Sequence, residues 1–518
     1  MRHLLSFALA LLCAQAAFAQ TVARGTVFDD RDRNGKRDSG EPGIPEVCVS
    51  NGREVVRTNA DGAWTLPVDD DCGIFVIKPR NWMTPVNGDQ IPQHFYLHKP
   101  NGSPTKDVPG VAPTGPLPES IDFPLYSRPE NDEFKVMLFG DTQARGLREV
   151  DFVTHDVVEE CIGTDADFGI SLGDNVADDP ALFSELNQSI AQIGIPWYNT
   201  FGNHDNNRDA KLNEHFDETF ERFFGPSTYA WEYGDVAFIS INDVYFKETG
   251  GYTCRLTDDQ LAFIKGYLDL LPKHRLVVFL MHIPYLRCEN KDALFAIFAD
   301  RPHTFSTAAH THTQFHRFLT KEDGWPGEKP HHHFISATVC GSWWCGGFDE
   351  LGIPHATMND GAPNGYSMLS FDGTRYSIEF KAARRPADCQ MNIYAPSELA
   401  AGEVQNTEVL VNVFAGSERS TVELRAGTTG AWIPLEQTRT IDPQCLRMSE
   451  LGPYLDSEVN GVKLDTVFGW KMDYPSETDH IWKGKLPKLE AGTHTLFVRT
   501  TDMFGQVYVD HRIVRVRP

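Results

Sequence analysis

The chain has 518 residues, a length that corresponds to about three domains of roughly 150 residues each. Its formal net charge of −25 at pH 7 disfavours broad contact with nucleic acid or with anionic membranes. A small anionic substrate remains compatible with this charge, because metal ions can reverse the local potential in an acidic protein.

The first 19 residues have the features of an export signal. A basic start at Arg2 is followed by an apolar run and by the small-residue pattern Ala17-Phe18-Ala19 ahead of Gln20. We predict cleavage between Ala19 and Gln20 and a periplasmic or secreted mature protein. No later stretch approaches the roughly 18 uninterrupted apolar residues of a membrane-spanning helix, so no transmembrane segment is expected.

Residues 20–80 alternate short β-type runs with Gly, Asn and Asp turns, which predicts a small N-terminal β-sandwich. Eleven prolines lie between Pro79 and Pro129. Proline lacks the backbone N–H that helices and central strands need, so we predict that residues 81–130 form an extended connector.

A calcium loop is a candidate near the mature N-terminus. The twelve-residue pattern for such loops places ligands at alternating positions and a glycine at the sharp turn, here Gly35. The alternative is a polar hairpin loop stabilised by its own arginines and lysines. The candidate calcium ligands are Asp30, Asp32, Asn34, Lys36, Asp38 and Glu41.

Residues 131–384 alternate apolar strand candidates with helical patterns, for example at 148–161 and 257–271, which predicts an α/β domain. From residue 385 to residue 518 the pattern is β-type again. We predict a second β-sandwich there, with a hairpin turn at 503–505.

Nine cysteines follow the export signal, and export permits disulfides. Proximity along the chain suggests four pairs and leaves Cys161 as a buried free thiol. The suggested pairs are Cys48 with Cys72, Cys254 with Cys288, Cys340 with Cys345, and Cys389 with Cys445.

Metal-ligand side chains follow five apolar runs of the central domain. Each residue alone is typical of a helix cap or a partly buried histidine, but the carboxyl ends of parallel strands meet at one edge of a sheet. Paired metal ions there would supply a bridging hydroxide as nucleophile and offset the negative charge of a phosphate ester. The residues, in chain order, are Asp141, Gln143, Asp174, Asn203, His204, Asp205, His282, His310 and His312.

These residues form short sequence blocks that resemble, in composition and order, those of the calcineurin-like metallophosphoesterases. The resemblance implies a four-layer αββα core flanked by two all-β sandwich domains. It implies that His204 acts on the phosphate as general acid or charge stabiliser, oriented by Asp205. It also implies that Asp174 bridges two metals, that Asp141, Gln143 and His312 hold the first, and that Asn203, His282 and His310 hold the second.

Two positions depart from the family pattern. Gln143 replaces the usual histidine of the first block, and Ala309 replaces the glycine before the last His-x-His. An amide oxygen is a harder and weaker ligand than imidazole, so Gln143 should favour hard divalent ions or lower the affinity of the first site. The alternative function is therefore a non-catalytic binding or adhesion protein with a degenerate site.

Two further clusters have open interpretations. His331, His332 and His333 open a predicted strand, where neighbouring side chains point to opposite faces, so strand initiation or surface exposure is favoured over a metal site. Trp343 and Trp344 follow that strand and could line a substrate pocket or fill a core.

The sequence thus predicts an exported metal-dependent phosphoesterase that hydrolyses phosphate mono- or diesters with a metal-bridging hydroxide. The expected cofactors are two divalent ions (Mn, Mg, Fe or Zn), with Ca²⁺ as a candidate in the N-terminal domain. The expected partner is a small phosphorylated substrate or phosphodiester, with no nucleic-acid surface; the sequence does not indicate an oligomeric state.

Overall fold

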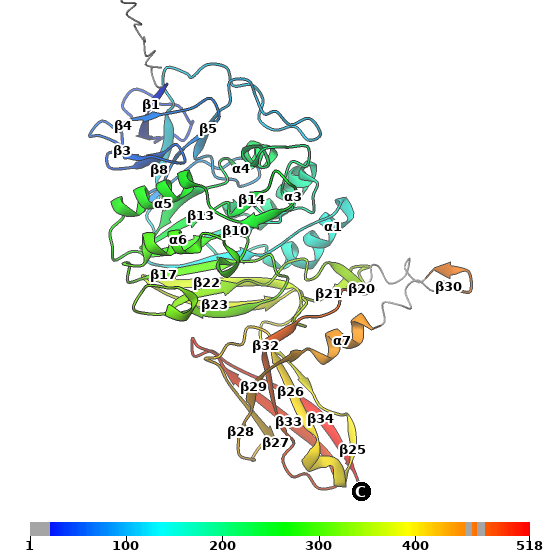
Figure 1. Cartoon of the computed structure of the whole chain (residues 1–518). Helices are drawn as coiled ribbons and strands as arrows, with labels where there is room; N and C mark the ends of the chain where they lie inside the picture. The colour runs from blue at the N-terminus through cyan, green and yellow to red at the C-terminus, as the bar shows by residue number, and fades with distance from the viewer. Residues whose placement is uncertain (1–20, 451–457, 464–471) are drawn as a thin grey trace, which may run out of the picture.

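The computed structural model describes residues 21–450, 458–463 and 472–518. An N-terminal β domain, a central α/β domain and a C-terminal β domain follow one another from blue to red in Figure 1. The predicted export signal, residues 1–19, lies outside the described residues. Among the described helices, none has the length and apolar character needed to cross a membrane.

The N-terminal domain packs two four-stranded sheets against each other, as predicted for a sandwich. Its core is formed by side chains from both sheets, among them Val27, Trp64, Ile74 and Phe123. One sheet has the order β4 (Ala63–Pro67), β1 (Val22–Asp29), β8 (Phe123–Ser127) and β6 (Trp82–Met83). The other has the order β3 (Val55–Arg57), β2 (Cys48–Ser50), β5 (Cys72–Val76) and β7 (Phe95–His98).

The predicted connector, residues 81–130, is not a plain extended linker. It supplies β6, β7 and β8, which complete both sheets of the N-terminal domain. The strands fit because the prolines lie mostly between them. Pro124 lies within β8, which pairs in parallel with β1.

The central domain contains two mixed sheets. The first has the order β11 (Trp197–Thr200), β10 (Phe168–Leu172), β9 (Glu133–Phe139), β22 (Gly365–Asp372) and β23 (Arg375–Ala382). The second has the order β12 (Tyr229–Tyr233), β13 (Val236–Ser240), β16 (Leu276–Leu280), β17 (Thr304–Ala308), β19 (His331–Ile335) and β18 (Phe315–Leu319). Two small hairpins complete the strands: β14 (Val244–Phe246) with β15 (Tyr252–Cys254), and β20 (Trp344–Phe348) with β21 (Pro354–Ala356).

Strand β9 shows how these sheets form the middle of four layers. Val136 and Leu138 point into the core shared with the second sheet, whereas Met137 and Phe139 point into the core shared with the helices of the first sheet. The first sheet is covered by α1 (Leu147–Val153), α2 (Glu159–Cys161) and α3 (Phe183–Ile190), with α4 (Glu218–Phe224) nearby; the second is covered by α5 (Asp258–Leu270) and α6 (Lys291–Phe298).

The C-terminal domain is a second sandwich with its own apolar core. One sheet has the order β24 (Met391–Tyr394), β26 (Glu408–Val413), β32 (Glu477–Lys485) and β29 (Glu436–Ile441). The other has the order β25 (Glu398–Ala400), β34 (Val507–Arg517), β33 (Gly492–Thr501), β27 (Thr421–Ala426) and β28 (Ile433–Pro434). Helix α7 (Pro443–Ser449) and the hairpin of β30 (Glu458–Val459) and β31 (Val462–Lys463) complete the described α-helices and strands.

Buried polar contacts join the C-terminal domain to the central domain. The Asn412 side chain donates to the carbonyl of Asp360 over 3.0 Å. A carboxylate oxygen of Asp360 in turn accepts from the backbone N–H of Gln314, two residues after the candidate ligand His312. The C-terminal domain therefore packs directly behind part of the candidate metal site.

One of the four suggested disulfides is present, between Cys254 and Cys288. The other three pairings are wrong, because Cys48, Cys72, Cys340, Cys345, Cys389 and Cys445 are free, as is the buried Cys161. The register of the N-terminal sheet explains why Cys48 and Cys72 do not pair. The backbone N–H of Ile77 donates to the carbonyl of Cys48, while Cys72 lies opposite His98. Cys345 instead packs near Cys445.

Candidate metal centre

The predicted ligands lie on loops at the carboxyl ends of five strands. Strands β9, β10 and β11 of the first sheet lead to Asp141, Asp174 and Asn203, and strands β16 and β17 of the second lead to His282 and His310. Because the two sheets face each other, these loops meet at one edge of the domain.

Several ligand positions have an unusual backbone. Asp141, Gln143, Asp174, His310 and His312 have positive φ angles of 25°, 37°, 48°, 68° and 51°. Non-glycine residues in this region cost of order 1–3 kcal/mol each, and such residues cluster at functional sites. The surrounding packing therefore holds these side chains at a conformational cost.

Two glycines let the loops approach one another. A Cβ added to Gly202 would lie 2.0 Å from the backbone nitrogen of Asp174, and one added to Gly173 would lie 2.7 Å from Nδ1 of His282. Both distances are too short for any side chain. Glycine is required because Gly202 touches the backbone of the Asp174 loop and Gly173 touches the His282 side chain.

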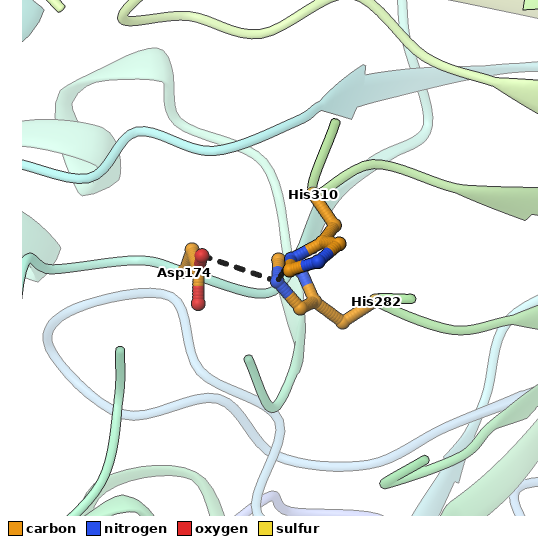
Figure 2. Close-up of side chains that lie close together, drawn as sticks. All are labelled: Asp174, His282 and His310. Carbon is orange, nitrogen blue, oxygen red and sulfur yellow. Dashed lines mark hydrogen bonds and ion pairs between the residues drawn. The ribbon is translucent and has the colours of Figure 1, made fainter. Parts of the chain in front are cut away.

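One group of donors converges around His282 (Figure 2). Its Nδ1 faces the carbonyl of Leu172 at 2.9 Å, and donation there leaves Nε2 available as a ligand. Nε2 lies 3.1 Å from each of Asp174 Oδ2, Asn203 Oδ1 and His310 Nδ1. A carboxylate oxygen, an amide oxygen and two imidazole nitrogens thus surround one position.

A second group lies beside Asp141. His312 Nδ1 faces the carbonyl of Gly341 at 2.5 Å, and its Nε2 lies 3.8 Å from Asp141 Oδ2. The buried Oδ1 of Asp141 has no hydrogen-bond partner among the described residues. Gln143 donates to Asp174 Oδ2 over 3.2 Å, so Asp174 contacts members of both groups.

The electrostatics of the site also favour a cation. Burial opposes charge on His282, but Asp174 and Asp141 raise its pKa to about 10. Burial raises the pKa of Asp141 to about 8. Burial lowers the pKa of His310 to about 3 and that of His312 to about 4, so both are neutral ligands at pH 7.

The residues present fit two divalent metal ions. Oδ1 of Asp141 is buried without a hydrogen-bond partner, and Nε2 of His282 faces only potential ligand atoms, an arrangement that suits bound cations. Asp174, Asn203, His282 and His310 would hold one ion. Asp141, Gln143, Asp174 and His312 would hold the other.

His204 has a different partner from the one expected. Its Nδ1 lies 2.9 Å from Asp178 Oδ1. Asp205, expected to orient this ring, instead accepts hydrogen bonds from the backbone of Val176 and Gly202 and from the Asn175 side chain. Sequence reasoning missed Asp178, whose only signal was its position four residues after Asp174.

The two tryptophans that follow β19 lie in different surroundings. Trp343 has a φ of 61°, and its ring packs 4.7 Å from the ring of His312. Trp344 is 1% exposed and donates from Nε1 to Asp156, so it fills the core against the helices. Cys340, a residue that the ligand prediction did not include, places Sγ 3.8 Å from His312 Nδ1 and 4.0 Å from Gln143 Oε1.

An aromatic residue, Tyr252, and a basic residue, Arg287, lie near His310. The ring of Tyr252, which is 41% exposed, lies edge-on 6.1 Å from His310. Burial is the main cause of the lowered pKa of His310, and the nearby charge of Arg287 adds to it. The disulfide joins Cys254, two residues after Tyr252, to Cys288, next to Arg287.

The two remaining clusters lie elsewhere. In the N-terminal loop, ligand atoms of Asp30, Asp32 and Glu41 lie within 4.8 Å of one another, and Asn34 donates to both Asp32 and Asp38; the backbone N–H of Lys36 donates to Asn34 Oδ1. The three histidines at 331–333 begin β19, as strand initiation required, but all three are buried rather than exposed.

Comparison with protein families agrees with this arrangement. Residues 134–314 match the family of calcineurin-like phosphoesterases, residues 31–108 match its N-terminal domain, and residues 333–508 match its C-terminal domain. The chain belongs to the calcineurin-like phosphoesterases. As a three-domain calcineurin-like phosphoesterase, it is a hydrolase of phosphoric ester bonds, and the family implies a dinuclear centre of divalent metals.

Among solved structures, this calcineurin-like phosphoesterase is similar to a purple acid phosphatase isolated from yellow lupin (Lupinus luteus) seeds. The two share 12% sequence identity, with a TM-score of 0.37, over 66% of this chain and 69% of the lupin chain. No curated protein matches the sequence.

Proposed function

We propose that this calcineurin-like phosphoesterase is exported and hydrolyses small phosphate mono- or diesters. The observation that carries the proposal is the convergence of Asp174, His282 and His310, with Asn203 and Asp141 beside them. When bound, two divalent ions supply Lewis acidity and an activated water. The Cys254–Cys288 disulfide and the predicted signal support export.

The residues of the chain divide the remaining tasks. The backbone N–H groups of His204 and His310 donate to Asp174 Oδ1 and Asp141 Oδ2, which fixes the carboxylates with their other oxygens near His282. His204 is half-buried beside the ligands, and it is the side chain to hold or donate a proton at the leaving oxygen. In the group of side chains beside Asp141, the amide of Gln143 favours hard ions such as Mn²⁺ and Mg²⁺ over softer ions.

The non-catalytic alternative has less support, because the chain retains every ligand except the replaced histidine at Gln143.

In the N-terminal domain, we propose that Asp30, Asp32, Asn34, Asp38 and Glu41, with the backbone of Lys36, bind Ca²⁺. The convergence of Asp30, Asp32 and Glu41 supports this.

The decisive experiment combines metal removal, reloading and two variants. Protein stripped by a chelator and reloaded with Mn²⁺, Mg²⁺, Fe²⁺ or Zn²⁺ is assayed with 4-nitrophenyl phosphate and bis(4-nitrophenyl) phosphate. We expect Asp174→Asn to lose bound metal and activity, and His204→Ala to keep its metal while kcat falls. Asp372→Asn, at an exposed hairpin end, is the matched control. Full activity in metal-free Asp174→Asn protein would refute the proposal.

A further inference from the structure

A cleft lies between the central and C-terminal domains and reaches the loop that carries His310 and His312. Its volume is about 330 Å³, and Thr311, which separates His310 from His312, forms part of its wall. Arg287 and Arg317 of the central domain and Arg439 of the C-terminal domain also line it. The cleft therefore extends from the ligand loop to the surface of β29 and β32.

We propose that this cleft is a substrate subsite for a second anionic group, so that the preferred substrates are phosphate esters that carry another phosphate. The inference rests on the proposed function, which it deepens. It also gives the C-terminal domain a role in substrate binding, since that domain forms one wall.

The charges in the cleft leave a net positive site. Arg317 and Arg439 lie 2.9 and 3.3 Å from the carboxylate of Asp479, and Arg439 also pairs with Glu477. In the described part of the chain, Arg287 has no ion pair. Three guanidinium groups thus face two carboxylates, in a chain whose overall charge is −25.

The lining has the chemistry that phosphate requires. Guanidinium groups bind phosphate oxygens through paired, charge-assisted hydrogen bonds, and they do so more strongly than neutral donors. The hydroxyls of Thr311 and Thr313 lie 2.7 Å apart in the loop that carries the candidate ligands, and they add donors there. An anion in the cleft would meet donors from both domains.

Both walls of the cleft are fixed to the metal centre. On one side, the Cys254–Cys288 disulfide and the hydrogen bond from Glu289 N–H to the Cys254 carbonyl hold the segment that carries Arg287. On the other side, the Ser476 N–H donates to the carbonyl of Asn359, whose own N–H donates to the carbonyl of His312, each over 2.8 Å. A preorganised subsite loses less entropy on binding.

The test uses the full-length, Mn²⁺-loaded enzyme and a series of substrates. The bisphosphates of propane-1,3-diol, butane-1,4-diol and hexane-1,6-diol are each compared with the monophosphate of the same diol. For at least one length, we expect kcat/KM for the bisphosphate to exceed that for the monophosphate about tenfold, as one charge-assisted contact would provide.

Arg287→Gln and Arg439→Gln should each reduce this preference about tenfold. The exposed Arg375→Gln in the central domain and Arg515→Gln in the C-terminal domain should leave it unchanged. Equal kcat/KM for both series at every length, or a preference that survives both cleft variants, would overturn the subsite. Stimulation of monophosphate hydrolysis by added inorganic phosphate would indicate a site for a free anion and would overturn it too. Failure to hydrolyse both series while bis(4-nitrophenyl) phosphate is still hydrolysed would overturn the subsite, and failure with that diester as well would refute the proposed function itself.

Discussion

Oδ1 of Asp178 lies 2.9 Å from Nδ1 of His204, and Oδ2 of the same carboxylate lies 2.9 Å from the guanidinium of Arg208. Asp178 is therefore held from both sides and can fix the His204 ring with Nε2 directed away from it. Despite the burial that opposes protonation, Asp178 and the charge of Asp174 raise the pKa of His204.

Replacing Asp178 with Asn should lower kcat about 10- to 100-fold, because His204 would lose the carboxylate that orients it and favours its protonated form. Metal content should stay at the wild-type level, since Asp178 is not among the ligands. Steady-state kinetics and elemental analysis measure the two quantities. Asp179→Asn, one residue further on, is the control. A loss of metal equal to the loss of rate would contradict the positioning role.

Gly202→Ala should damage the site through its backbone alone. The added methyl would lie 2.0 Å from the Asp174 nitrogen and 2.4 Å from its Oδ1, and relief of such overlap costs about 1–3 kcal/mol. We expect a lower melting temperature and weaker metal binding. Gly88→Ala, where no atom lies within 4 Å of the added Cβ, should behave as wild type.

Metal binding should release protons. Asp174 and Asp141 raise the pKa of His282 to about 10 against the effect of burial, so its Nε2 carries a proton at pH 7 that a metal must displace. Calorimetric titration of the stripped protein with Mn²⁺, repeated in buffers of different ionisation enthalpy, should show release of at least one proton. The affinity should rise about tenfold per pH unit between pH 7 and pH 9. Binding without proton release would disprove this protonation state.

The raised pKa of His282 also predicts how the stability of the stripped protein depends on pH. A raised pKa means that protonation of His282 stabilises the folded state fully below the unfolded value of about 6.5, and that this contribution is lost as pH rises towards 10. The melting temperature of stripped protein should fall over this range more than that of metal-loaded protein. Parallel curves for the two forms would count against the interpretation.

Calcium should stabilise the N-terminal domain if Asp30, Asp32 and Glu41 bind it. A ligand that binds only the folded state raises stability by about 2.7 kcal/mol at 100 times its Kd. Thermal unfolding with and without Ca²⁺ should show a higher melting temperature for wild type and no shift for Glu41→Gln. Asp61→Asn, at an exposed turn of the same domain, should respond like wild type. A shift that persists in Glu41→Gln would exclude this loop as its source.

The convergence of the candidate ligands was accessible from the sequence, because the ligand loops follow buried apolar strands and such strands end at a common edge. Strand alternation and helix periodicity also gave the order of the three domains. The partner of His204 was not accessible, because Asp205 is its neighbour in sequence, whereas Asp178 belongs to the loop after β10 and meets His204 only in the folded structure. Trp343 and Trp344 are adjacent, yet a positive φ at Trp343 sends one to the ligands and the other to the core.

The errors have a common physical cause. Proline content predicted a connector at 81–130, but prolines are tolerated between strands and in β8, whose pairing partners come from distant residues. Short sequence separation suggested the disulfides, but sheet register decides which cysteines meet. The cleft between the central and C-terminal domains has no local signal, because its arginines come from positions 287, 317 and 439.

Strands β9, β10 and β11 belong to one sheet, whereas β16 and β17 belong to the other. The two ions would therefore sit across the seam between the halves of the central domain and act as a cross-link between them. Neither half can assemble a complete coordination sphere by itself, so ion capture would report that both halves have already docked correctly.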